Sequence, residues 1–293
     1  MSWREIEASI RAAVGHRFEV AQALPLSGGC IHSAYQIRGG GEHFFVKLAE
    51  PNLSNAFAGE AEGLRMLSAT GTVRVPLPIC EGKTATEAYL VLEYLHLKPR
   101  DSVSDRRLGE QLAALHAIEQ PAFGWTRDNF IGATPQPNEL GDDWVEFWRR
   151  RRLGWQLQLA AENGYGGRLQ RLGERLLVGL DRLLADYRPR PVLLHGDLWS
   201  GNAAMTDAGV PVIFDPACYW GDRETDLAMT ELFGGFSGAF YDAYESLMPR
   251  WPGYETRSML YNLYHVLNHL NLFGGGYLRQ AETLLERLLM ETG

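Results

Sequence analysis

The chain has 293 residues, 45% hydrophobic and 22% charged, and its 28 basic and 36 acidic side chains give a formal net charge of −8 at pH 7. This length suffices for a two-lobed globular enzyme with a large core. The acidic balance argues against a nucleic-acid partner. The one basic run, Arg149 to Arg152, lies between tryptophans in a helical pattern, and we expect it to be a solvated helix face.

The termini and cysteines indicate the compartment. Ser2 and Glu5 form a capping-box pattern that predicts a helix through Val14, and we find no secretory signal there. No apolar run approaches the ~18–20 residues that span a bilayer. The three cysteines are widely spaced and lack a C-x-x-C pair, so neither a disulfide framework nor a zinc site is expected. We therefore expect a cytoplasmic protein without a membrane partner.

The residues after this helix have a β pattern. We expect strands from Phe18 to Leu26, from Ser33 to Ile37 and from His43 to Leu48, separated by glycine-containing turns. This layout is that of a kinase N-lobe. The backbone N–H groups of Ser27, Gly28 and Gly29 can lie over nucleotide phosphates. Two adjacent glycines also occur in many hairpins, so the turn by itself is weak evidence.

Lys47 lies near the end of the third strand, in F-F-V-K-L, and a helix is expected from Leu53 to Ser68. Such a lysine usually extends its ammonium group to solvent. In a kinase, however, a strand lysine holds the nucleotide phosphates while a helix carboxylate fixes its position. Glu60, in the second turn of that helix, is the natural partner, because Glu62 points to a different side.

A buried strand from Ala88 to Glu93 is followed by Tyr94 and Leu95. In a kinase this stretch links the lobes and lends backbone groups to the adenine edge, so we assign Glu93, Tyr94 and Leu95 to nucleotide binding. The expected fold is α+β and protein-kinase-like. Its β-rich N-lobe covers residues 1–95 and its mainly helical C-lobe covers residues 96–293.

The C-lobe contains seven apolar patterns of helical period, and Phe123 to Pro135 between the first two is expected to be a polar loop. The patterns cover Leu108 to Ile118, Asp143 to Glu162, Leu169 to Tyr187, Thr225 to Phe233 and the three segments Phe240 to Leu247, Glu255 to Phe273 and Tyr277 to Met290. His116 is expected to be a core or capping residue. His265 and His269 are four residues apart on one helix, but their neighbours favour core packing over a metal site.

The chemistry concentrates between Val192 and Trp220. One apolar strand delivers H-G-D, with Asp197, and Asn202 follows five residues later; a second apolar strand delivers Asp215 in D-P-A. Protein kinases use H-R-D-x-x-x-x-N and D-F-G with the same Asp-to-Asn spacing. We therefore expect ATP and Mg²⁺ as cofactors. Asp197 is the predicted base for the substrate hydroxyl, and Asn202 and Asp215 are the predicted metal ligands.

The string HGDLWSGN, followed by FDPACYWGDRETDLAMTELFGGF, resembles the fructosamine kinase (ketosamine-3-kinase) family, and GGCI, FVK, GEAEGLRML and VRVP extend the likeness through the N-lobe. The resemblance implies phosphorylation of a sugar hydroxyl of ketosamines, either as metabolites or on glycated proteins, and hence deglycation. It also implies that Cys30 can form an intermolecular disulfide, which gives a monomer or a redox-dependent homodimer. Filling space in the turn is the other interpretation of Cys30.

Several alternatives remain open. Trp199 can stack on a sugar-like substrate or pack in the core. The substrate can be an aminoglycoside, choline or another small molecule taken by the same fold, and a non-catalytic binding protein on a kinase scaffold is a further class. The presence of Lys47, Asp197, Asn202 and Asp215 argues against the last of these. Asp226 is expected to cap its helix or to tie the preceding loop.

Overall fold

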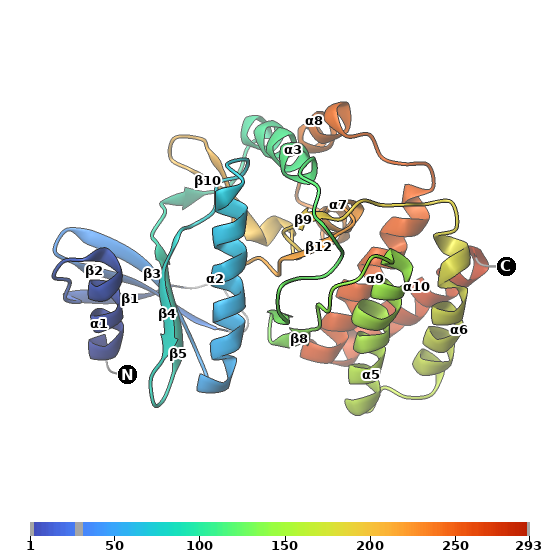
Figure 1. The fold of residues 1–293 in the computed structure, drawn as a ribbon, viewed down its shortest axis with the longest axis horizontal. Coiled ribbons are helices and arrows are strands. Elements are labelled where there is room, and N and C mark those ends of the chain that lie inside the picture. The colour runs from blue at the N-terminus through green and yellow to red at the C-terminus, as the bar shows by residue number, and fades with distance from the viewer. Residues whose placement is uncertain (1–2, 27–31, 292–293) are drawn as a thin grey trace.

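The computed structural model describes residues 3–26 and 32–291 (Figure 1). A five-stranded antiparallel sheet with strand order β1-β2-β3-β5-β4 occupies the N-terminal end. Helices α1 and α2 lie on its two faces (Figure 1). The bounds are α1 Trp3–Val14, β1 Gln22–Leu26, β2 Ser33–Gly39, β3 Glu42–Ala49, η1 Pro51–Leu53, α2 Ser54–Ala69, β4 Pro78–Lys83 and β5 Ala88–Glu93.

The alternation of side chains along β3 divides the sheet into two faces. Phe44, Val46 and Leu48 pack with Ile6 and Ile10 of α1 in a small core. Lys47 points to the opposite face, because successive residues of a strand point to opposite sides. That face is covered by α2, whose Phe57, Leu64 and Leu67 join the large core of the molecule. The strand pattern thus directs one buried lysine toward the helix that carries Glu60.

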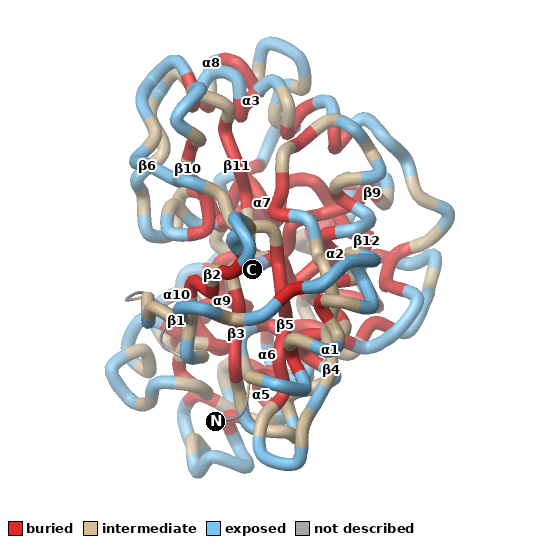
Figure 2. The backbone as a smooth tube through the Cα atoms, turned by 90° about the vertical axis from the view of Figure 1, so that its left-hand side faces the viewer, coloured by how far each residue is buried: buried red, intermediate tan, exposed pale blue. Residues whose placement is uncertain are grey.

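The remaining chain is mainly helical, with four short strand pairings that hold the loops between the helices. Its elements are β6 Leu97–Lys98, α3 Ser102–His116, β7 Asn129–Ile131, β8 Thr134–Gln136, α4 Trp144–Phe147, η2 Trp148–Gly154, α5 Trp155–Glu162, α6 Arg168–Leu183, β9 Val192–Leu194, η3 Ser200–Asn202, β10 Ala203–Thr206, β11 Pro211–Ile213, β12 Tyr219–Gly221, α7 Glu224–Leu232, α8 Gly238–Leu247, α9 Tyr254–Phe273, η4 Gly275–Tyr277 and α10 Leu278–Glu291. Figure 2 shows the buried backbone in the interior and exposed stretches at the periphery.

Most predicted elements are present, but three differ. The first strand begins at Gln22 rather than Phe18, because Phe18 fills the core beside Phe44 without joining the sheet. Strand β4 was not predicted, because its half-buried residues give no clear alternation. The segment expected to be a loop after Phe123 contains the hairpin β7–β8, whose buried residues are mostly polar and therefore gave no apolar signal.

The basic run Arg149 to Arg152 is only partly the solvated helix face that the sequence predicted. A π-helical segment, η2, interrupts the predicted long helix and turns Arg152 fully inward. Its guanidinium lies 4.0 Å from the ring centroid of Tyr219 and donates hydrogen bonds to Pro137 O and Asn138 Oδ1, both at 2.8 Å. Arg150 alone of the four is largely exposed, as expected for the whole run. Among the described residues, no helix is long and apolar enough to cross a bilayer.

Candidate active site

The H-G-D turn follows β9, which pairs with β12. Gly196 adopts φ +81°, and a Cβ built there would lie 2.1 Å from Ala217 O, so only glycine fits this position. His195 is completely buried, with Nε2 3.0 Å from Phe214 O and Nδ1 3.3 Å from the Asp197 amide nitrogen. Burial lowers the pKa of His195. A neutral imidazole that braces the loop at both ring nitrogens accounts for these contacts.

Asp226, at the start of α7, holds the H-G-D turn in place through its carboxylate. Its two carboxylate oxygens accept the backbone N–H groups of His195 and Gly196, both at 2.8 Å. Oδ2 also lies 3.3 Å from His116 Nε2, and His116 Nδ1 lies 2.8 Å from the Tyr244 hydroxyl. Burial by itself would raise the pKa of Asp226, but these hydrogen bonds outweigh it and lower the pKa. Asp226 ties the loop, and His116 is a core residue, as expected.

Asp197 and Asn202 face each other across the turn η3. Asn202 Nδ2 donates to the backbone oxygen of Asp197 at 2.9 Å and to Asp197 Oδ2 at 3.3 Å. Burial and the nearby charge of Asp215 raise the pKa of Asp197 to about 7. The carboxyl group is thus held in one orientation by the amide and has a raised proton affinity.

Lys47 lies between two carboxylates from distant parts of the chain. Its Nζ is 2.7 Å from Glu60 Oε1 on α2 and 2.5 Å from Asp215 Oδ1 after β11. Asp215 adopts φ +57°, a conformation that non-glycine residues rarely adopt. Burial would lower the pKa of Lys47, but the two carboxylates raise it above its ordinary value. The structure therefore pairs Lys47 with Glu60, as the sequence predicted, and brings Asp215 to the same ammonium group.

The donor set fits a magnesium ion. Among the described residues, Asp215 Oδ2 and Asn202 Oδ1 accept no hydrogen bond, so each leaves one oxygen for a cation. Three carboxylates, those of Glu60, Asp197 and Asp215, accompany one ammonium group, which leaves excess negative charge. The described residues contain no group of three or more His, Cys, Asp or Glu side chains arranged for a metal. Mg²⁺ commonly takes few protein ligands and completes its shell with phosphate oxygens and water.

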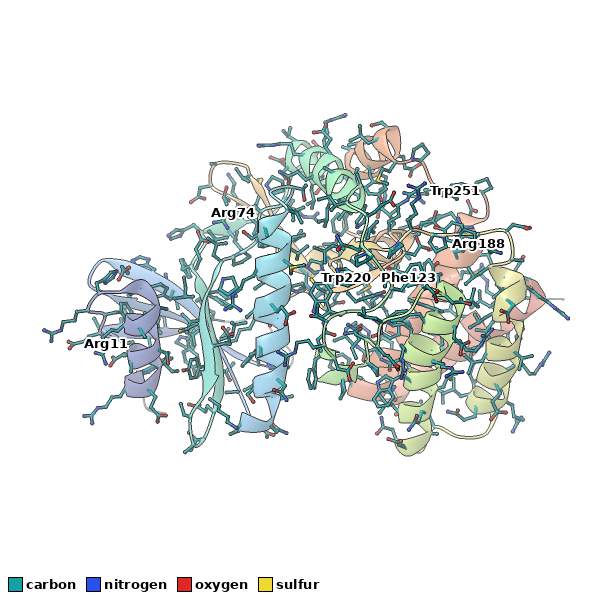
Figure 3. The ribbon with its side chains drawn as sticks, in the orientation of Figure 1. Arg11, Arg74, Phe123, Arg188, Trp220 and Trp251 are labelled. Atoms are coloured by element: carbon teal, nitrogen blue, oxygen red, sulfur yellow. The ribbon has the colours of Figure 1, made fainter. Side chains whose placement is uncertain are left out.

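The predicted linker residues follow the last long strand of the sheet. The Glu93 carboxylate is engaged by Arg74 at 2.5 Å and by the Leu77 amide at 3.2 Å. Figure 3 labels Arg74 near the end of α2. The ring of Tyr94 lies between those of His43 and His96, at 6.1 and 5.2 Å. Since the Glu93 carboxylate is already paired within the protein, Glu93 offers a ligand its backbone groups.

Trp199 is 38% exposed two residues after Asp197. Its ring meets Phe233 edge-on with centroids 6.1 Å apart, and Phe233 in turn lies 5.1 Å from His269. Core packing therefore accounts for only part of the Trp199 surface. Sequence reasoning missed Phe233 as a neighbour of Trp199. His269 Nδ1 bonds to His265 O.

Ser27, Gly28, Gly29 and Cys30 lie outside the described residues, so their predicted contacts with phosphates and the redox prediction for Cys30 stay predictions.

Comparison with known proteins gives one family. A family model described as fructosamine kinase matches residues 2–291. A "probable ketoamine kinase" from Synechocystis sp. is 48% identical over 290 residues, which cover 98% of this chain and 97% of that protein. The chloroplastic protein-ribulosamine 3-kinase of Oryza sativa subsp. japonica is 38% identical over 94% of this chain and 81% of its own.

Solved structures agree. The crystal structure of a "putative fructosamine-3-kinase" from Haemophilus somnus has a TM-score of 0.91 at 30% identity, over 98% of this chain and 97% of that chain. A thermostable mutant of the aminoglycoside phosphotransferase APH(4)-Ia has a TM-score of 0.62 at 16% identity, over 97% of this chain and 98% of its own, which shows a shared fold alone. The expected protein-kinase-like α+β fold is confirmed.

Proposed function

Because the chain belongs to the fructosamine kinase family, we propose that it is an ATP-dependent kinase that phosphorylates a sugar hydroxyl of ketosamines. The observation that carries this proposal is the pairing of Asp197 with Asn202 beside the Lys47–Asp215–Glu60 cluster. This set provides a base for a hydroxyl, oxygen ligands for a cation and an ammonium group for phosphates. The residue roles below belong to the same proposal.

Asp197 orients the substrate hydroxyl and accepts its proton. Its pKa of about 7 suits this role, because a general base works best when its pKa lies near the working pH. The Asn202 amide fixes the carboxylate by donating to it, and Asp226 fixes the backbone on which Asp197 stands. Little covalent chemistry falls to the protein, since positioning and charge neutralisation dominate phosphoryl transfer.

Lys47 binds the nucleotide phosphates, with Glu60 holding its ammonium group in place. Asp215 and Asn202 would hold the Mg²⁺ ion that accompanies the nucleotide, and this ion would neutralise charge on the transferred phosphate. Ser27, Gly28 and Gly29 cover the phosphates, and backbone groups of Glu93, Tyr94 and Leu95 contact the adenine. The lobes divide near residue 95, so that ATP lies between residues 1–95 and 96–293.

Trp199 is the proposed contact for the sugar part of the substrate. Its exposed indole face lies two residues from Asp197 and is supported from the side by Phe233. A flat aromatic surface beside the base can position a sugar by stacking on its C–H face. Phosphorylation of a ketosamine destabilises the adduct and frees the amine, which makes deglycation of metabolites or proteins the proposed consequence.

A substrate panel tests the proposal. The purified chain would be incubated with Mg-ATP and with ribulosamine or fructosamine derivatives of lysine, kanamycin or choline, and phosphorylated products would be identified by mass spectrometry. We expect turnover of the ketosamines and none of the other two. The Asp197→Asn variant serves as the inactive control. Turnover of kanamycin or choline without turnover of any ketosamine would reverse the substrate assignment.

Cys30 is the proposed redox residue of the predicted phosphate turn, and the oligomeric state follows from it. Thiolates, rather than thiols, are the reactive form, and neighbouring backbone amides and a lysine favour the thiolate. Non-reducing gels and activity would be compared with and without dithiothreitol for wild type and Cys30→Ala. An oxidant-dependent dimer in wild type that is lost in Cys30→Ala is the expected result. A monomer under all conditions leaves Cys30 a space-filling residue.

A further inference from the structure

Helix α2 contains two buried glycines, Gly59 and Gly63, one turn apart and close to Glu60. A Cβ built at Gly59 would lie 2.9 Å from Asn129 Cβ, and one built at Gly63 would lie 2.9 Å from Cys218 Sγ. Glycine inside a helix is destabilising, so a close approach of another segment is the physical reason for it here. The backbone of α2 therefore rests directly on Asn129 and Cys218, which belong to the C-terminal part of the chain.

Asn129 connects these two contacts. Its side chain is 3% exposed, and Nδ2 donates to Cys218 O at 2.7 Å. Oδ1 accepts hydrogen bonds from Gln136 Nε2 at 2.9 Å and from Asn138 Nδ2 at 2.7 Å. Gln136 Nε2 also lies 3.1 Å from Ala217 O. A buried amide with these bonds can take only one orientation, which fixes the hairpin β7–β8 against the segment after Asp215.

The segment held by Asn129 adjoins the backbone that carries both carboxylates of the proposed reaction. Asp215 lies two residues before Ala217, and the Ala217 amide donates to His195 O at 2.9 Å. Ala217 O also lies where a Cβ of Gly196 would be, next to Asp197. A displacement of residues 217–218 would therefore move the metal-ligand loop and the H-G-D turn together.

A second tie joins α2 to the stretch before Asn129. Thr126 Oγ1 donates to Glu62 Oε1 at 2.7 Å, and Arg127 Nη1 lies 3.9 Å from Glu62 Oε2. The same stretch runs beside β12, where the Gly124 amide donates to Trp220 O at 2.9 Å. Phe123 and Trp220, labelled in Figure 3, lie on the side of α2 that faces the helices of the C-terminal part. Residues 123–138 thus contact α2 at two places, through Asn129 at Gly59 and through Thr126 and Arg127 at Glu62.

We propose that Asn129 is a positioning residue that fastens α2 to the Ala217–Cys218 segment and so holds Glu60 and Asp215 on Lys47 from opposite sides. Helix α2 packs directly against Asn129 and Cys218, with no gap at its two glycines. The arrangement of the lysine and the carboxylates is therefore built into the fold and requires no separate activating movement of this helix. The kinetic readouts rest on the proposed kinase function, whereas a thiol-protection readout does not.

Asn129→Asp tests the hydrogen bond from Asn129 to Cys218 O, since it keeps the side-chain size and replaces the donor by an acceptor. We expect kcat to fall on the order of 10- to 100-fold, because a misplacement of about 1 Å can cost that much. KM for the ketosamine should stay near the wild-type value. Asn52→Asp, at an exposed position, is the matched control. A purely structural role would lower the melting temperature while leaving kcat unchanged, and that result would overturn the proposal.

Gly63→Ala tests the second contact of α2, which is the packing of Gly63 against Cys218. The added methyl group should push α2 away from Cys218, lower kcat and expose the thiol, which is 1% exposed in the native chain. Cys218→Ala removes the sulfur that the methyl group meets, so the double variant Gly63→Ala/Cys218→Ala should recover part of the lost kcat. Met66→Ala, on the exposed face of α2, is the control.

Alkylation of Cys218, followed by peptide mass spectrometry, supplies the readout that needs no substrate. Wild type should be protected and Gly63→Ala labelled faster. If wild type turns over no ketosamine, the proposed function fails, while the protection of Cys218 still measures the packing of α2 against Cys218. If Gly63→Ala keeps both wild-type kcat and wild-type protection, α2 does not pack on Cys218 as proposed. The inference then fails, whatever the outcome for the proposed function.

Discussion

The carboxylate of Asp226 accepts the backbone amide hydrogen of His195 at 2.8 Å, although 31 positions separate the two residues. This bond joins the start of α7 to the turn that presents Asp197. The turn is therefore held by a buried charge as well as by strand pairing, and the first prediction follows from it.

Asp226→Asn should weaken the turn that presents Asp197. The new amide has one NH₂ donor group, which would face the backbone N–H of either His195 or Gly196 where an oxygen now accepts. We expect the free energy of unfolding to fall by about 3 kcal/mol, the upper range for hydrogen bonds to a charged group. Activity should fall as well at temperatures where the variant is folded. Chemical denaturation and kcat would be measured, with the exposed Asp242→Asn as the control. Wild-type stability in Asp226→Asn would contradict the role of the buried carboxylate.

Asp197→Asn should remove phosphoryl transfer while ATP still binds, because the amide cannot accept the hydroxyl proton. We expect kcat to fall on the order of 10²- to 10⁴-fold, the usual contribution of a general base. Nucleotide binding would be measured by calorimetry and transfer by product formation. Asp207→Asn, in the exposed β10–β11 turn, is the matched control. A variant that retains near wild-type turnover would show that Asp197 is not the base.

Asp215→Asn should act on the metal instead. Lys47 keeps its ion pair with Glu60 at 2.7 Å, so the cluster survives, but one charged oxygen ligand is lost. The Mg²⁺ concentration for half-maximal nucleotide binding should rise at least about tenfold, since even indirect partners of a metal contribute that much. Titration of Mg²⁺ at fixed ATP, followed by thermal shift, checks this. An unchanged titration curve would exclude Asp215 as a ligand.

Acid should destabilise the fold through His265. Burial and the neighbouring His269 lower the pKa of His265 to about 3 from an ordinary 6.5. The unfolded chain therefore takes up a proton below about 6.5 while the folded chain does not, so stability falls as the pH drops through the window between these values. At pH 5 the loss relative to pH 7 should be about 2 kcal/mol from this residue.

Urea unfolding of wild type and of His265→Gln at pH 7 and pH 5 measures this effect. The variant should show a smaller loss on acidification, while the exposed His96→Gln should behave as wild type. An identical pH dependence in wild type and His265→Gln would mean that His265 is not held neutral in the folded chain.

Local patterns predicted much of the fold. The apolar alternation around Lys47 gave β3, the apolar strand before His195 gave β9, and the helix of Glu60 was placed within one residue at each end. These signals are local, since side-chain period and turn residues are decided within a few positions. The spacing of Asp197, Asn202 and Asp215 added the chemistry, because a phosphoryl-transfer site needs a base and oxygen ligands at strand ends.

The polar interior was invisible in the sequence. Asn129, Gln136 and Arg152 are each at least 97% buried, yet composition assigns such residues to the surface. Their burial depends on hydrogen-bond partners from elements far along the chain, for instance Cys218 O for Asn129. Sequence reasoning therefore placed Asn129 in a polar loop and Arg152 on a solvated helix face.

The sequence by itself led to the residues that we propose carry the chemistry, and it placed Lys47 on a strand and Glu60 on the following helix. Only the tertiary structure decided that Asp215 joins Lys47 across 168 positions and that Asp226 holds the turn of Asp197. Contacts between distant segments leave no periodic trace, because they are set by how packed elements meet and not by local propensity. The close approach at Gly59 and Gly63 is of this kind: two glycines in a helix signal a neighbour, but only the fold identifies that neighbour as Asn129 and Cys218.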